Sequence, residues 1–192
     1  MKALIQLKLV WLLAILLLGV QGCATMTPSE INQKRAETRT MADQTLTLVT
    51  QQYPGAKSLL KKSAGYAVFS NFGFKIMFGG SARGDGLAFN NATRQTIFMK
   101  MIELQPGFGF GAQKFKVVFI FDNQKAFNDF VNSGWEFGAN TAASIKSDSQ
   151  GVGGELGTVV SPGVHMYQLS ETGAIVGISI TGAKYYRNDD LN

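Results

Sequence analysis

The side chains most often used in catalysis are scarce in this sequence. His165 is the only histidine, which excludes sites built from several histidines. A serine–histidine–aspartate arrangement would have to use this one residue, which lies in a largely apolar stretch, and the sequence has no G-x-S-x-G motif. A packed or surface histidine explains His165 better. We therefore predict that the protein is not an enzyme.

Four carboxylates lie near glycine-rich stretches, where a pair of catalytic acids would have to meet. They are Asp85, Glu103, Glu136 and Glu155, and nothing in their spacing brings any two of them together. General acid–base chemistry needs such groups within reach of one substrate. The sequence therefore predicts no catalytic carboxylate pair, no metal and no cofactor.

Two glycine-rich tracts resemble phosphate-binding loops. Residues 107–112 match G-x-G-x-x-A, but a dinucleotide site needs this loop to open a helix, whereas an apolar strand pattern follows here. Residues 79–86 lack the lysine and the serine or threonine of a P-loop. We interpret residues 79–86 as a glycine-bent turn between strands and assign no nucleotide to either tract.

Cys23 is the residue whose setting points to a specific modification. Two lysines precede an apolar run of 12 residues, 9–20, which suits a signal-peptide core and is too short to cross a bilayer as a helix. The letters V-Q-G-C at residues 20–23 then resemble a lipobox. Cys23 is the only cysteine and has no disulfide partner, so acylation explains it better than an uncleaved anchor or a buried thiol does. We predict a signal peptide over residues 1–22 and lipid on Cys23.

The net charge argues against nucleic acid as a partner. The whole chain carries 18 Lys+Arg and 13 Asp+Glu, and removal of residues 1–22 takes away two lysines and no acid, which leaves a net charge of +3. This charge is small and evenly spread, whereas nucleic-acid binders concentrate basic residues on one surface.

The composition of the mature chain changes near residue 64. All 14 phenylalanines lie between Phe69 and Phe137, and 19 of the 20 glycines that follow the signal peptide lie at or beyond Gly65. We therefore predict a lipidated N-terminus and helical arm over residues 23–54, followed by a β-rich domain over residues 55–192.

The elements predicted from residue patterns give an α+β fold. Thr27, Pro28 and Glu30 form a capping box that starts a helix reaching Gln52, with a thin apolar stripe that suits a helix on the domain surface or standing off it. Two shorter helices are expected over residues 56–64 and 123–131. Strands are expected over residues 66–70, 75–78, 86–89, 96–104, 115–121, 163–169 and 174–181. Short strands with many glycines predict a strongly bent antiparallel sheet or partial barrel, with the helical arm at its N-terminus and one or two helices packed on it.

Lys57, Lys61 and Lys62 are the candidate contacts for an anionic surface. Their spacing places them on one face of the short helix over residues 56–64. Each basic residue near an anionic membrane is worth about 1 kcal/mol, or about 3 kcal/mol for the three. A solvated lysine face is the alternative, and the residues alone do not separate the two.

Five blocks of the sequence, taken in order, resemble the SYLF-domain family. They are L-K-K-S-A-G-Y-A-V-F at residues 60–69, the glycines of residues 79–86, G-F-G-F-G-A-Q and the apolar strand at residues 107–121, G-A-N at residues 138–140, and the terminal blocks between residues 167 and 183. The resemblance covers about residues 56–187. It departs from the family where T-I-F at residues 96–98 replaces a usual tryptophan, and where residues 147–154 replace a Gly-Pro-x-Gly segment.

The resemblance implies a phospholipid-binding module. Eukaryotic members bind phosphoinositides and some fungal members bind actin, whereas bacterial members are mostly envelope lipoproteins. We therefore expect a lipid-anchored protein of the bacterial cell envelope, on the outer membrane and facing the periplasm, whose partner is an anionic phospholipid membrane. The alternative is a structural protein of the envelope that docks a protein partner and uses its lipid only as an anchor.

Overall fold

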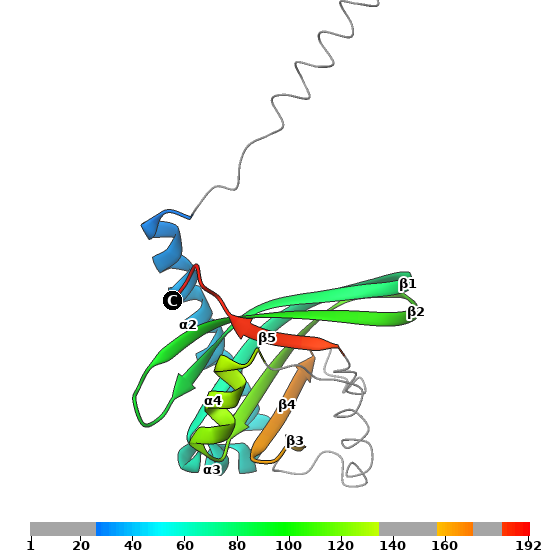
Figure 1. Ribbon diagram of the computed structural model, residues 1–192. Coiled ribbons are helices and arrows are strands. Elements are labelled where there is room, and N and C mark those ends of the chain that lie inside the picture. Colours follow the sequence, from blue (N-terminus) through cyan, green and yellow to red (C-terminus); the bar gives the residue numbers. More distant parts are fainter. Residues whose placement is uncertain (1–25, 135–156, 171–181) are drawn as a thin grey trace, which may run out of the picture.

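The computed structural model describes residues 26–134, 157–170 and 182–192. These residues form α2 (Pro28–Gln52), α3 (Pro54–Lys62), β1 (Gly65–Asn90), β2 (Thr96–Phe121), α4 (Gln124–Asn132), β3 (Thr158–Ser161), β4 (Val164–Ser170) and β5 (Ala183–Arg187), as Figure 1 shows. The signal peptide, Cys23 and the strand predicted over residues 174–181 lie outside the described residues.

Two helix starts are confirmed at the level of single hydrogen bonds. The Thr27 hydroxyl accepts from the Glu30 backbone N–H, while the Glu30 carboxylate accepts from the Thr27 backbone N–H at 2.7 Å, so the capping box begins α2 as predicted. At α4, the Asn123 side chain accepts from the Ala126 N–H at 2.9 Å. Both contacts satisfy backbone donors that the first helical turn leaves without a partner.

β1 and β2 form one long antiparallel ribbon. Their register runs from Gly65 opposite Phe121 to Phe89 opposite Thr96, with one irregularity between Met77 and Gly79. The predicted turn over residues 79–86, and the division of β1 into three short strands, are therefore wrong. The strand continues through these glycines because hydrogen bonds to the opposite strand hold it extended, which local composition does not reveal.

The ribbon bends back near Met77, so that the two halves of β1 lie against each other. A Cβ atom added at Gly65, Gly84 or Gly86 would overlap atoms of the other half of β1, and glycine therefore permits this approach. β4 and β5 each pair with a different half of β2, and β3 pairs with β4. The result is a strongly bent, antiparallel five-stranded sheet, which confirms the predicted α+β class (Figure 1).

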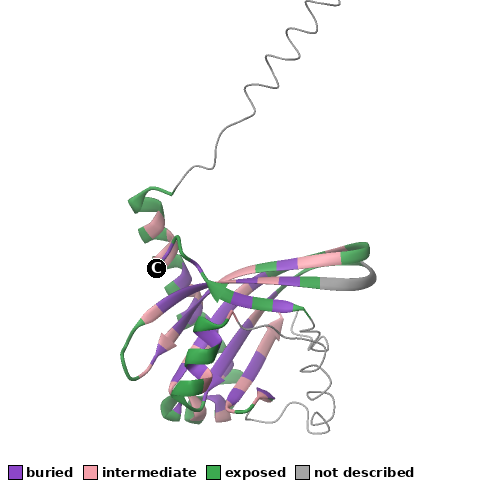
Figure 2. Cartoon of the chain, viewed as in Figure 1, coloured by how far each residue is buried: buried purple, intermediate pink, exposed green. Residues whose placement is uncertain are grey.

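Helices cover both faces of this sheet. On one face Phe127, Phe130 and Val131 of α4 pack with Phe69 and Phe119 in a core rich in aromatic rings. On the opposite face α2 and α3 cover a second core cluster that includes Val68, Leu87, Phe98, Val118 and Ile120. Figure 2 shows that burial is concentrated in this layered body and decreases where β1 and β2 extend beyond it.

None of the helices in the described ranges is both long enough and apolar enough to serve as a membrane-spanning segment.

Candidate surface-binding site

The register of β1 and β2 determines which side chains share a face of the sheet. Val68 and Leu87 of β1, and Phe98 of β2, lie on the face beneath α2. Side chains alternate along each strand, and residues paired across an antiparallel ladder point to the same side. The same face therefore continues away from α2 through Ser70, Phe72, Phe74, Ile76, Arg83, Asp85, Lys100, Ile102, Leu104, Phe110 and Lys114.

Coverage by α2 ends at an ion pair. Lys34 Nζ of α2 lies 3.1 Å from Asp85 Oδ2 of β1, and both side chains are about half exposed. Beyond this pair, none of the described helices covers the sheet on the α2 face. We call the uncovered surface the arm face; it consists of Phe72, Phe74, Ile76, Ile102, Leu104 and Phe110 together with the cations Arg83, Lys100 and Lys114.

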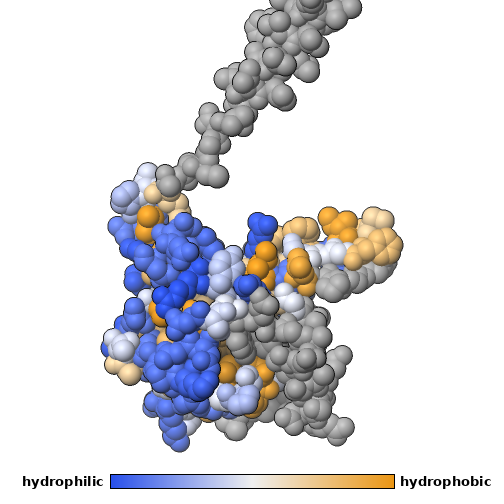
Figure 3. Space-filling view, viewed as in Figure 1, coloured by the Kyte–Doolittle hydropathy of each residue, from blue (hydrophilic) through white to orange (hydrophobic). Residues whose placement is uncertain are grey.

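The apolar part of the arm face is unusually exposed. Phe72 is 50% exposed, Ile76 59% and Phe110 70%, and at the bend the neighbouring Phe78 is 74% exposed. The space-filling view shows apolar residues gathered at the end of the β1–β2 arm, whereas the surface over α2 and α3 is largely hydrophilic (Figure 3). Contiguous exposed apolar surface of this kind marks a site of interaction with a membrane or another molecule.

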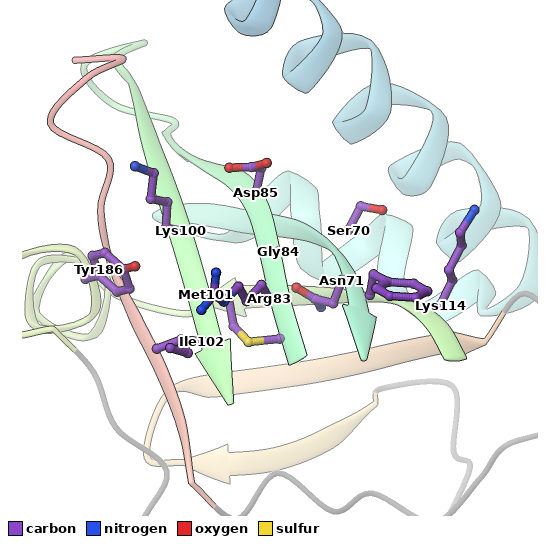
Figure 4. Close-up of a pocket in the computed structure, with 11 residues that line it drawn as sticks. Ser70, Asn71, Arg83, Gly84, Asp85, Lys100, Met101, Ile102, Lys114 and Tyr186 are labelled. Carbon is purple, nitrogen blue, oxygen red and sulfur yellow. The ribbon is translucent and has the colours of Figure 1, made fainter. Parts of the chain in front are cut away.

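A hollow of about 740 Å³ lies at the base of the arm. Its lining includes Arg83, Asp85, Lys100 and Lys114 from the two long strands, and Tyr186 from β5 (Figure 4). Asp85 is already paired with Lys34, and Lys100 Nζ lies 2.9 Å from Asp190 Oδ2. Within the described ranges no ion pair is formed by Arg83 or Lys114, so the hollow favours an anionic ligand.

Asn71 adds an uncommon feature to the lining of this hollow. Its amide lies in space that a side chain at Gly84 would fill (Figure 4). The side chain is 2% exposed, and among the described residues neither its Oδ1 nor its Nδ2 has a hydrogen-bond partner. Buried amides of this kind are normally satisfied. Asn71 pairs with the core residue Phe115 across the ladder, so its side chain lies on the sheet face opposite the cations.

The three lysines predicted from sequence lie elsewhere. Lys57, Lys61 and Lys62 are exposed on α3, which follows α2 at the end opposite Pro28. A helix of 25 residues such as α2 is roughly 37 Å long. Figure 1 shows α3 and the arm at different ends of the molecule, so these lysines do not share a surface with the arm face.

Sequence reasoning missed the arm face because it treated its two strands as separate pieces. One local signal was present: Phe72, Phe74 and Ile76 alternate with Gly73 and Lys75, which is the pattern of a strand with one apolar face. Arg83, Lys100 and Lys114 are far apart in sequence, and only the register of the ribbon together with its bend near Met77 brings them together.

The catalytic candidates that lie within the described residues do not assemble into an active site there. His165 Nε2 lies 3.1 Å from Asp122 Oδ2, but its buried Nδ1 makes no hydrogen bond in the described part of the chain, so no hydroxyl nucleophile completes a triad there. Asp85 and Glu103 point to opposite faces of the sheet and do not form a pair. Glu136 and Glu155 lie outside the described residues, and the described ranges contain no cluster of metal ligands.

The fold is a bent sheet with a helical layer on each face and an arm that projects with apolar and basic side chains. Residues 103–192 match the Ysc84 family model, which is described as a Las17-binding protein actin regulator. The match confirms the resemblance to this family, the SYLF-domain family, over residues 103–192.

A curated relative extends the comparison beyond the match to the family model. The chain is similar to the beta cell expansion factor A of Aeromonas veronii, with 31% identity over 166 residues. The aligned region covers 86% of this chain and 62% of the relative, so the chain spans less than two thirds of that protein's length.

Proposed function

We propose that this chain is a non-enzymatic envelope lipoprotein whose SYLF domain binds anionic phospholipid. The observation that carries the proposal is the arm face, where exposed phenylalanine and isoleucine side chains continue into a hollow lined by Arg83, Lys100 and Lys114. An anionic bilayer offers the same two features in the same order, an apolar interior beneath a negatively charged surface.

The N-terminus supplies the second part of the proposal. Acylation of Cys23 would hold the domain at a membrane, so that weak contacts of its surface act at high effective concentration. Ala24 follows the cysteine, and by resemblance to enteric sorting rules we propose the outer membrane, with the domain in the periplasm. Lys57, Lys61 and Lys62 are the sequence-derived proposal for the charged contact.

Vesicle binding tests the lipid proposal directly. The unlipidated chain beginning at residue 24 keeps every described element. We expect it to co-sediment with vesicles that contain phosphatidylglycerol or cardiolipin, to bind phosphatidylcholine vesicles weakly, and to lose affinity as salt is added, because salt screens the attraction. Binding that is independent of anionic lipid content would contradict the proposal.

A protein-docking function is the alternative, and one observation favours it. The matching family model is described as a Las17-binding protein actin regulator, which names a protein partner. An exposed apolar strand face also suits a protein interface. Absence of binding to any vesicle composition by a folded chain would put this alternative ahead of lipid binding.

A further inference from the structure

We propose that the β1–β2 arm is the part of the domain that enters the membrane, with its apolar end among the acyl chains and the cationic hollow at its base in the headgroup layer. The inference rests on the proposed lipid binding and adds the element, orientation and headgroup chemistry of the contact. The ligand class is a phospholipid with an anionic, phosphate-bearing headgroup.

The spacing along the arm fits this arrangement. Phe72 lies opposite Lys114, and Ile76, four residues farther toward the bend, lies opposite Phe110. Four strand residues span about 13 Å. Apolar faces of interfacial elements are buried about 5–10 Å into the boundary between headgroups and acyl chains. With Lys114 at the phosphates, the side chains of Phe74, Ile76 and Phe110 therefore reach the apolar layer.

The hollow at the base has the groups that a phosphate-bearing headgroup needs. Arg83 and Lys114 supply positive charge that no described carboxylate neutralises. A guanidinium donates two parallel hydrogen bonds to phosphate oxygens, and an ammonium adds a point charge. Apolar and basic groups thus follow one another along the arm in the order of a bilayer, which favours a membrane over a second copy of the chain.

Single-tryptophan variants test the depth of the arm. In a chain beginning at residue 24, Trp135 is the one tryptophan. We expect that Phe78→Trp in a Trp135→Phe background shifts its emission to the blue on anionic vesicles and is quenched by lipids brominated in the acyl chains. The matched control is Leu48→Trp, at a position of α2 that is 46% exposed, and it should show neither effect.

Paired substitutions then separate the arm from the α3 lysines. Phe74→Asp with Ile76→Asp changes side chains that are already exposed, so circular dichroism should remain unchanged while vesicle affinity falls at least tenfold. Arg83→Gln with Lys114→Gln should lower affinity by about 30-fold, from two basic residues near an anionic surface. Replacement of Lys57, Lys61 and Lys62 by Gln should change affinity by less than about threefold, because these lysines then face away from the membrane.

Other outcomes would contradict either the role of the arm or the lipid binding on which it rests. If the triple lysine variant loses about 100-fold in affinity while the arm variants bind normally, lipid binding stands and the arm proposal is wrong. Quenching at residue 48 and not at residue 78 leads to the same conclusion. If no variant and no wild-type chain binds vesicles, the proposed lipid binding itself fails. A blue shift of Trp at residue 78 that depends on protein concentration and needs no vesicles would assign the arm face to self-association.

Discussion

Glycine positions in β1 show how much a single methyl group can decide in this fold. Val68 O and the Phe69 ring occupy the space where a side chain at Gly86 would project. At Gly79, near the bend of the ribbon, no atom of the described residues other than its chain neighbours lies within 4 Å of that position. Two residues of the same type in one strand therefore have opposite tolerance to substitution.

We expect Gly86→Ala to lower the free energy of unfolding by about 1–3 kcal/mol or more, because the new methyl group must displace backbone of the other half of β1. Gly79→Ala should change it by less than about 0.5 kcal/mol, as for other open surface sites. Urea unfolding followed by circular dichroism measures both. Equal effects would contradict the close approach of the two halves of β1.

Substitution of Cys23 should have a clear effect on processing and acylation of the precursor. Cys23→Ser removes the only thiol, so the precursor should remain unprocessed and take up no radiolabelled palmitate. The label and the shift in mass on cleavage can be read from the same gel. An acylated Cys23→Ser protein would overturn the assignment of the lipid to this residue.

Among the elements, α2 contributes more to the core than its sequence suggests. The structure buries Thr38, Ala42, Thr45 and Val49 of this helix and leaves Leu48 exposed. The buried side is made of small side chains that fit closely over Val68 and Phe98. Arg35 and Arg39 extend over the Phe98 ring from the same helix, at 5.9 and 5.1 Å from its centroid.

We therefore expect a fragment that begins at residue 55 to lose cooperative thermal unfolding. Removing α2 exposes apolar side chains worth about 1.5–3 kcal/mol each, and a few of these equal the whole stability of a typical domain. Alanine substitutions at two neighbouring positions of α2 test the same contribution to stability in smaller steps. Val49→Ala should cost about 2 kcal/mol and Leu48→Ala close to zero, since Val49 is fully buried and Leu48 is 46% exposed. A stable 55–192 fragment would show that α2 is dispensable for the fold.

For the molecule as a whole, buried tyrosines set a limit on alkaline stability. Burial raises the pKa of the Tyr167 phenol to about 12, with a smaller contribution from Tyr53. Burial and then the nearby charge of Glu103 raise the pKa of Tyr185, and burial followed by Asp43 raises that of Tyr66. All three groups are packed in the cores that join helices to sheet.

The direction of the pH effect follows from these shifts. A phenol with a raised pKa in the folded state holds its proton more tightly there than in the unfolded chain, so its contribution to stability is complete below about pH 10. We expect stability to fall as pH rises from about 10 toward 12. Absorbance at 295 nm should show tyrosine ionisation that coincides with unfolding. Titration of all tyrosines near pH 10 in a folded protein would contradict this.

The sequence by itself determined the helix ends and strands that depend only on residues close together along the chain. The capping box at Thr27, the helix near residues 123–131 and β4 were predicted because a helix end or an alternating strand is specified within a few residues. The scarcity of histidine and cysteine likewise limited the available chemistry from composition alone.

Only the tertiary structure decided where the candidate site lies. β1 remains extended through Gly79, Gly80 and Gly84 because β2 supplies hydrogen bonds along its length, and that pairing connects residues far apart in sequence. The same sheet face is core where α2 covers Val68 and is exposed at Phe72 and Phe74, only a few residues away. Alternation predicts that these side chains share a face, but the length and position of α2 determine which of them remain available for binding.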